Sequence, residues 1–165
     1  MINIREFQTR DIKKICRILN HYIRYTDYNL EEKSINEKQF NKIAENVLSN
    51  NYPFLVIEDN SKFIGFAYLD QFNPKVGYKI TADLTIYLKP NLKRSGYGSM
   101  LVNEIEKLAV ERGIENIISI ITESNIASIR FHRRHGYKKI AYLKNIALKK
   151  GQYCGVFYFQ KSIKK

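Results

Sequence analysis

The sequence lacks the features that would assign it to a membrane or a secreted class. No apolar run approaches the roughly 18 residues that a membrane-spanning helix needs. The first ten residues, MINIREFQTR, contain no apolar core of a secretory signal. Cys16 and Cys154 are the only cysteines and form no closely spaced motif. We therefore expect a cytoplasmic protein with two free thiols and no membrane partner.

Internal repeats, low-complexity segments and linkers are also missing from the 165 residues. A chain of this length can bury a sizeable core. With 44% hydrophobic and 13% aromatic residues, the composition excludes a disordered chain. We predict a single domain that spans residues 1–165.

Acidic residues are few, with 16 Asp and Glu against 28 Lys and Arg, for a formal net charge of +12. Such an excess is typical of proteins that bind nucleic acid, an anionic membrane surface or an anionic small ligand. The cations, however, are spread along the chain, which is also what a general compositional bias produces. Charge alone therefore leaves the partner open.

Hydrophobic periodicity predicts alternating strands and helices. Strands are expected at 1–7, 54–58, 63–71, 78–88, 114–122, 137–143 and 152–160, and helices at 9–26, from about 34, at 97–112 and at 125–135. Thr9 or Asp11 is expected to cap the first helix, and Ser34 with Glu37 to form a capping box on the second. This order predicts an α/β fold with a mixed sheet, helices on both faces and a right-handed crossover over 79–121.

The strand at 78–88 alternates between two kinds of side chain. The apolar residues Ile80, Ala82, Leu84, Ile86 and Leu88 share one face. The other face carries Thr81, Asp83, Thr85 and Tyr87. Because side chains of a strand point alternately to opposite sides, we expect one buried face and one polar, partly open face.

A strand-to-helix corner follows, with the sequence LKPNLKRSGYGSMLV at 88–102. Pro90 cannot donate to a sheet and should end the strand near Leu88. Gly96 and Gly98 permit positive φ and let the main chain approach a ligand closely. The helix that begins near Tyr97 starts with unpaired N–H groups and the positive end of its dipole.

Lys93 and Arg94 add full charges to this corner, which makes it suited to a phosphate or pyrophosphate. An ordinary glycine turn with surface cations nearby is the alternative. Neither the Gly-Lys-Ser/Thr ending of a nucleotide P-loop nor the three-glycine dinucleotide pattern is present. The corner by itself leaves both interpretations open.

The longer stretch TIYLKPNLKRSGYGSML, 85–101, resembles the acetyl-CoA motif of GNAT-type N-acetyltransferases, Arg/Gln-x-x-Gly-x-Gly/Ala, with Lys93 at the Arg/Gln position. A second family motif is similar to NIASIRFHRRHGY at 125–137. The segments NHYI, YPFLV, TAD-T-Y and SIRFH, in this order, resemble the phosphinothricin N-acetyltransferase group. The resemblance runs from residue 2 to about 163 and implies the GNAT fold: a mostly antiparallel twisted sheet with one splayed parallel pair.

The resemblance implies acetyl-CoA as cosubstrate and no metal. The end of the strand at 78–88 would pair with the pantetheine arm of acetyl-CoA, and the corner that follows would hold the pyrophosphate. Asn125 would hydrogen-bond the arm unless it serves only as a helix N-cap. The implied cofactor-binding residues are Ile86, Tyr87, Leu88, Lys93, Arg94, Ser95, Gly96, Tyr97, Gly98, Ser99 and Asn125.

Three residues take catalytic positions by the same resemblance. Asp83 stands where the family has Glu and would take a proton from the acceptor amine, either directly or through water, the water route being favoured because its side chain is one methylene shorter; a solvated strand residue is the alternative. The Leu88 N–H would stabilise the oxyanion that forms on the thioester oxygen when the amine attacks. His132, which would face the same cleft, could orient substrate or protonate the leaving thiolate, or could simply pack in the core.

Asn29, Lys75, Tyr78 and His132 occupy the substrate positions of the phosphinothricin group, with Lys75 in place of the usual Arg. A lysine still pairs with a carboxylate or phosphinate but lacks the bidentate fork of arginine. The expected acceptor is an amino acid or analogue such as phosphinothricin, methionine sulfone or methionine sulfoximine, acetylated by direct attack in a ternary complex. Neither cysteine lies in a matched motif, which weighs against a covalent acyl-enzyme.

Two alternatives stay open from the sequence. A protein or peptide N-acetyltransferase would need an open acceptor groove. A nucleic-acid-binding module is suggested by RFHRRHGYKK, yet Arg130, Arg133 and Arg134 lie away from the face that carries Asn125 and His132, so nucleic acid is the less expected partner. The resemblance also implies a homodimer.

Overall fold

The computed structural model describes residues 1–92 and 96–164. The strands are β1 (Ile2–Glu6), β2 (Phe54–Asp59), β3 (Lys62–Gln71), β4 (Thr81–Leu88), β5 (Asn116–Thr122), β6 (Lys138–Lys149) and β7 (Gln152–Ser162). The α-helices are α1 (Ile12–Tyr25), α2 (Glu37–Ser49), α3 (Tyr97–Glu111) and α4 (Ile126–Arg134), with short 3-10 turns at Thr9–Asp11 and Val76–Tyr78.

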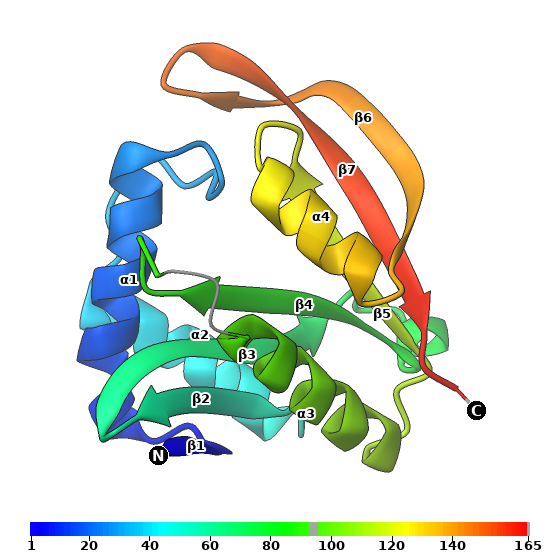
Figure 1. The fold of residues 1–165 in the computed structure, drawn as a ribbon. Helices are drawn as coiled ribbons and strands as arrows, with labels where there is room; N and C mark the ends of the chain where they lie inside the picture. Colours follow the sequence, from blue (N-terminus) through cyan, green and yellow to red (C-terminus); the bar gives the residue numbers. More distant parts are fainter. Residues whose placement is uncertain (93–95, 165) are drawn as a thin grey trace.

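The strands form one twisted sheet in the order β1-β2-β3-β4-β5-β7-β6 (Figure 1). Neighbouring strands are antiparallel except for β4 and β5, which are parallel. The connection between these two strands contains α3, as a parallel pair requires. The predicted mixed, mostly antiparallel sheet with one parallel pair is therefore confirmed.

Two hydrophobic cores lie on opposite faces of the sheet. Helices α1 and α2 cover one face, where Phe40 and Ile15 are fully buried and pack with Phe66 of β3. Helix α3 covers the other face, where its Leu101 and Ile105 are fully buried in a core that also receives Ile129 of α4. The predicted helices on both faces are confirmed.

The alternation expected for β4 is present. Ala82 and Leu84 are buried in the core under α3, and Ile86 and Leu88 pack against it. Tyr87 belongs to the opposite core, under α1 and α2. The polar side chains of β4 therefore face the α1–α2 side of the sheet.

Helix starts differ from the sequence prediction. The second helix begins after Asn36, whose side chain accepts from the Gln39 N–H while Gln39 reaches back to the Asn36 N–H. The predicted box of Ser34 and Glu37 is wrong by two residues, because Asn36 offers the same hydrogen bonds at the position directly before the helix.

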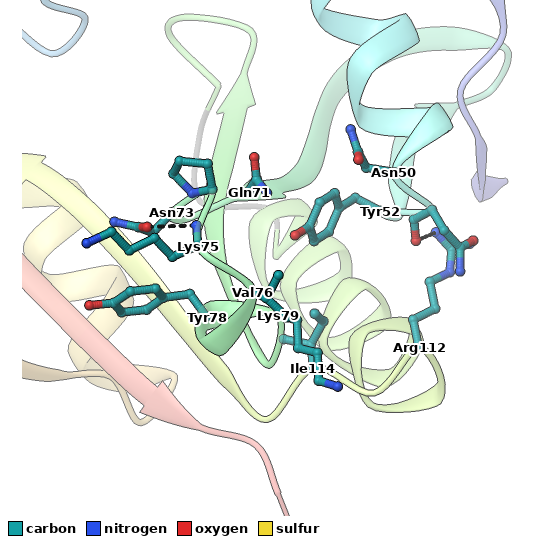
Figure 2. Close-up of a pocket in the computed structure, with 12 residues that line it drawn as sticks. Asn50, Tyr52, Gln71, Asn73, Lys75, Val76, Tyr78, Lys79, Arg112 and Ile114 are labelled. Carbon is teal, nitrogen blue, oxygen red and sulfur yellow. Dashed lines mark hydrogen bonds between the residues drawn. The ribbon is translucent and has the colours of Figure 1, made fainter.

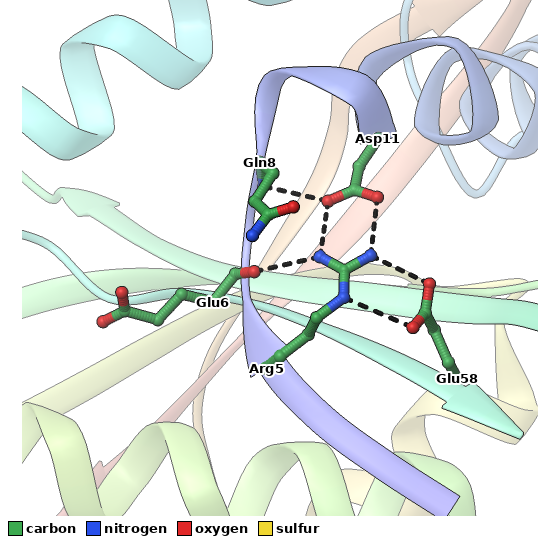
Figure 3. A network of polar contacts seen from close by, with 5 residues as sticks. All are labelled: Arg5, Glu6, Gln8, Asp11 and Glu58. Carbon is green, nitrogen blue, oxygen red and sulfur yellow. Dashed lines mark hydrogen bonds and ion pairs between the residues drawn. The ribbon is translucent and has the colours of Figure 1, made fainter. Parts of the chain in front are cut away.

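Asp11 does not cap α1 with its side chain, and the prediction of a cap there is also wrong. Its carboxylate, fully buried, accepts two hydrogen bonds of 2.8 Å from the Arg5 guanidinium, and Glu58 accepts from the same group (Figure 3). The Gln8 N–H also donates to Asp11. Burial alone would raise the pKa of Asp11, but these hydrogen bonds outweigh it and lower that pKa.

The last two strands form a hairpin longer than the sequence predicted. β6 continues to Lys149 rather than ending near residue 143, because it pairs with β7 through two irregular positions along its length. Nearly all of β6 is exposed. Within the described part of the chain, no helix is long and apolar enough to cross a membrane.

Candidate active site

The parallel pair at the centre of the sheet separates after three residues. β4 pairs with β5 only from Thr81 to Asp83, opposite Asn116 to Ile118. Beyond that point β4 stays paired with β3 as far as Leu88, while β5 stays paired with β7. The two strands therefore diverge, and after Asp83 no strand of the described residues pairs with the β5 side of β4.

The main-chain groups at this free edge follow from the strand alternation. Lys89 donates its N–H to the Ile64 oxygen of β3 at 2.8 Å. Because successive N–H groups of a strand point to opposite sides, those of Leu88 and Ile86 point away from β3, into the divergence. Tyr87 lies between them and directs its main-chain groups to β3, opposite Phe66. The free edge is thus provided by Ile86 and Leu88.

Tyr22 of α1 reaches the same edge. Its hydroxyl donates to the Leu88 oxygen at 2.9 Å, and its ring lies 5.2 Å from that of Tyr87. Burial raises the pKa of the Tyr22 hydroxyl, which keeps it protonated and able to donate. The bond uses the carbonyl of Leu88 and leaves its N–H free to bind another group.

The corner after β4 leads into the N-terminus of α3. Gly96 has φ of 76°, in the left-handed region, and the helix starts at the next residue. A Cβ at Gly96 would meet no described atom within 4 Å, so the space beside it is open. Gly98, in contrast, is buried, and a Cβ there would lie 3.0 Å from the Phe131 ring of α4. Lys93, Arg94 and Ser95 lie outside the described residues.

Asp83 lies at the point where the strands diverge. Asp70 of β3 is its direct cross-strand partner, so both carboxylates are on the α1–α2 face of the sheet. Burial raises the pKa of Asp83 to about 6, and the neighbouring negative charge of Asp70 adds to the increase. A carboxyl group with this pKa is mostly ionised at neutral pH, and because its pKa is close to that pH it can accept a proton effectively.

Asn29, one of the predicted substrate residues, is tied into the structure at both ends of its side chain. Its Nδ2 donates to the Tyr87 hydroxyl at 3.2 Å, and its Oδ1 accepts from the Glu31 N–H at 2.9 Å. Burial raises the pKa of Tyr87 to about 12. The structure therefore brings Asn29 to β4, where it binds the Tyr87 hydroxyl.

Lys75 and Tyr78 lie elsewhere, in the segment that leads into β4. Both are exposed and line a cavity of about 300 Å³, with their side chains extending to the side away from Tyr52 and Arg112 (Figure 2). Tyr87 is six residues along β4 from its first residue, about 20 Å in an extended strand. Asn29 and the 75–78 segment therefore meet β4 toward opposite ends, and the structure does not gather the predicted substrate residues in one place.

His132 is buried, with 2% of its surface exposed. Its Nδ1 lies 2.9 Å from the Ser128 oxygen, its Nε2 has no described hydrogen-bond partner, and its ring packs edge-on against Tyr137. Burial lowers its pKa, which favours the neutral ring. This environment favours the packing alternative, and a role in substrate binding or catalysis stays a prediction.

Asn125 is the N-cap of α4, where its side chain accepts from the Ser128 N–H at 3.1 Å. The predicted capping role is confirmed. The side-chain NH₂ is not used by the cap, so the predicted hydrogen bond to a ligand remains compatible with it.

Sequence reasoning missed Asp70 and Tyr22 as members of this site. Asp70 is hidden in the sequence because only the register of β3 on β4 places it opposite Asp83. Tyr22 lies in the NHYI segment that carries part of the family resemblance, but nothing in the sequence shows that its hydroxyl reaches Leu88. Among the described residues, no group of three or more His, Cys, Asp or Glu side chains is arranged to hold a metal ion.

Comparison with known proteins agrees with this geometry. Residues 4–155 match the family model of the acetyltransferase (GNAT) domain. A phosphinothricin N-acetyltransferase of Streptomyces viridochromogenes is 27% identical over 160 residues, covering 97% of this chain and 87% of the relative.

Two solved structures have the same fold. A Salmonella typhimurium protein solved with acetyl-CoA superposes with a TM-score of 0.95 at 23% identity, over 100% of this chain and 95% of that one. A ribosomal-protein-alanine N-acetyltransferase of Brucella melitensis superposes with a TM-score of 0.93 at 27% identity, over 97% and 99% of the two chains.

Proposed function

The chain belongs to the GNAT family of acetyl-CoA-dependent N-acetyltransferases, and we propose that its acceptor is the primary amine of a small amino acid or amino-acid analogue. The observation that carries this proposal is the divergence of β4 from β5 directly after Asp83. The strand that carries this partly buried carboxylate of raised pKa also has its free edge on the side where β4 and β5 diverge.

The residues that the structure describes are suited to acetyl-CoA. The outward main-chain groups of Ile86 and Leu88 offer an edge for an extended amide-bearing arm. The first N–H groups of α3, with the open space beside Gly96, offer a seat for the pyrophosphate. When bound, the cosubstrate supplies an activated acetyl thioester. Lys93, Arg94 and Ser95 stay predicted contacts.

Asp83 is proposed as the base that deprotonates the acceptor amine. A primary amine is mostly protonated at neutral pH and must lose a proton to become a nucleophile. Leu88 is five residues from Asp83, about 16 Å along an extended strand, so the proton would travel through water rather than by direct contact. The pair of Asp83 and Asp70 would also attract the positively charged acceptor.

The Leu88 N–H is proposed as the oxyanion donor. Attack on a thioester moves negative charge to the carbonyl oxygen, and a fixed N–H aimed at that oxygen stabilises the transition state more than the ground state. Tyr22 holds the Leu88 carbonyl, which fixes the orientation of this peptide group.

The test is a screen of free amino acids, phosphinothricin, methionine sulfone and methionine sulfoximine for acetyl-CoA-dependent release of free thiol. Saturable acetylation of at least one of them supports the proposal, and product analysis should place the acetyl group on the α-amine. Activity on peptides without activity on any free amino acid would refute it.

A protein or peptide N-acetyltransferase is the second candidate, because the Brucella melitensis structure at 27% identity carries a ribosomal-protein-alanine acetyltransferase name. Acetylation of a peptide with an N-terminal alanine, at a higher kcat/KM than free alanine, would favour it. A cytoplasmic location, a single domain over residues 1–165 and a homodimer remain predictions.

A further inference from the structure

Lys149, the last residue of β6, is a buried cation that forms no ion pair with a carboxylate of the described residues. Its side chain is 3% exposed. The ammonium donates to three main-chain oxygens, those of Ile23 at 2.9 Å, Asn29 at 2.8 Å and Glu31. An ammonium has three N–H donors, so this cluster of carbonyls satisfies all of them. Burying a charge is costly unless it is fully hydrogen-bonded, which makes this a specific arrangement rather than a chance contact.

The three oxygens come from two adjoining parts of the chain. Ile23 lies in the last turn of α1, where carbonyls lack intrahelical partners and the helix dipole favours a cation. Asn29 and Glu31 lie in the segment between α1 and α2. The neighbouring Lys150 adds contacts to the same region, from its Nζ to the Arg24 oxygen and from its N–H to a Glu32 carboxylate. The tip of the β6–β7 hairpin is thereby joined to the 26–33 segment.

The 26–33 segment in turn contacts β4. The main chain of Asn29 accepts from Lys149, while its side chain donates to the Tyr87 hydroxyl. Tyr28 of the same segment packs against the ring of Tyr22, which holds the Leu88 carbonyl. A continuous series of contacts therefore runs from the Lys149 ammonium to Tyr87 and Leu88 of β4.

We propose that Lys149 is a positioning residue: by binding the carbonyls of Ile23, Asn29 and Glu31, it fixes the 26–33 segment so that Asn29 holds Tyr87 beside the acceptor site. This inference rests on the proposed function in one respect, that the acceptor meets β4 on the side of Tyr87. The hairpin then serves acetyl transfer from a distance, without touching the reacting atoms.

The first test needs no acceptor. Lys149→Met keeps an apolar side chain of similar length and removes every donor, while Lys138→Met alters an exposed lysine of the same strand as a matched control. Hydrogen exchange of the amides at 26–33 should be at least about tenfold faster in Lys149→Met and unchanged in Lys138→Met. If Lys149→Met does not fold, Lys149→Arg, whose planar guanidinium does not match three converging carbonyls, is compared instead. Unchanged exchange in the variant that folds would overturn the proposal.

The second test is kinetic, with an acceptor from the screen. Lys149→Met should lower kcat/KM for the acceptor about tenfold or more, because misplacement of substrate-positioning groups is costly, with the KM for acetyl-CoA changed less than about threefold. In a Tyr87→Phe background, which removes the hydroxyl that Asn29 binds, the loss caused by Lys149→Met should be much smaller.

If Lys149→Met lowers kcat/KM by the same factor in the unaltered protein and in the Tyr87→Phe background, Lys149 does not act through Asn29 and the proposed route is refuted. Failure of every free amino acid in the screen would refute the proposed acceptor class, while the exchange experiment still decides the role of Lys149.

Discussion

Replacement of Asp70 by Asn should move the acid limb of the pH–rate profile to lower pH. Asp70 and Asp83 are direct cross-strand partners, and the negative charge of Asp70 disfavours ionisation of Asp83. Among the described residues, the hydroxyls of Tyr68 and Tyr52 also lie near Asp70, and they are neutral at the relevant pH because the ordinary pKa of tyrosine is about 10 and burial raises it further. Asp70 is therefore the charged group whose removal should act on Asp83.

The size of the effect follows from the causes of the raised pKa. The pKa of Asp83 is raised from 3.8 to about 6, an increase of about 2. Burial is the larger cause and persists in the variant, so loss of Asp70 should lower the pKa by on the order of one or less. If activity requires ionised Asp83, a pKa of about 6 leaves about 10% of the enzyme active at pH 5, and a pKa of about 5 leaves about half. Relative kcat/KM at pH 5 should then rise by up to about fivefold.

The assay is kcat/KM for one acceptor from pH 4.5 to 8.5, each enzyme scaled to its own plateau. Glu111→Gln, which removes an exposed carboxylate of α3, controls for the change in net charge. An acid limb that stays in place in Asp70→Asn, or that moves equally in Glu111→Gln, would show that Asp83 does not act as the base under the influence of Asp70.

Three further predictions concern single replacements. Asp83→Asn should lower turnover about 10²-fold at pH 7.5. The same change should raise the free energy of unfolding at pH 7.5 by up to about 3 kcal/mol. The unaltered protein loses this stability as pH rises from about 4 to 6, because the pKa of Asp83 is raised in the folded state, and a neutral amide removes that loss. Measurements of rate against pH check the first effect and urea titrations the second. Gly96→Val should raise the KM for acetyl-CoA, because a β-branched side chain at φ of 76° is strained and fills the open space; equal cofactor binding by calorimetry would contradict the proposed seat. Asp11→Ala should lower the free energy of unfolding measured in urea by about 3 kcal/mol, because it removes a buried partner of Arg5. Since the pKa of Asp11 is lowered in the folded protein, its contribution to the stability of the unaltered protein should decrease as pH falls.

Local patterns in the sequence predicted several parts of the site correctly. The period-two alternation of β4 separates Asp83 and Tyr87 from the apolar face, and this arrangement holds in the fold. Gly96 is in the left-handed conformation that a tight turn into α3 requires. Asn125 caps α4, as its position at the start of the helix predicted at 125–135 indicated. Each of these features depends on a few neighbouring residues, which is why the sequence contains enough information to predict it.

Features that depend on pairing between distant segments could not be predicted in this way. Asp70 opposes Asp83 only because β3 and β4 pair in one register, and a shift of one residue would move it to the other face. The burial of His132 depends on the rings of Tyr137 and Phe159, which come from other parts of the chain and pack against it. A pKa depends on the same packing, because burial and nearby charge both act through space.

The sequence by itself determined the family, the order of strands and helices, and the strand-to-helix corner at 88–98, because these depend on local patterns of polarity, glycine and charge. Only the tertiary structure decided that Tyr22 holds the Leu88 carbonyl and that Lys149 joins the β6–β7 hairpin to the segment beside Tyr87. Those contacts connect residues 66 and 120 positions apart, Tyr22 to Leu88 and Lys149 to Asn29. Each contact forms only when the folded sheet and helices bring a donor and a particular main-chain oxygen together, and no local pattern in the sequence predicts that contact.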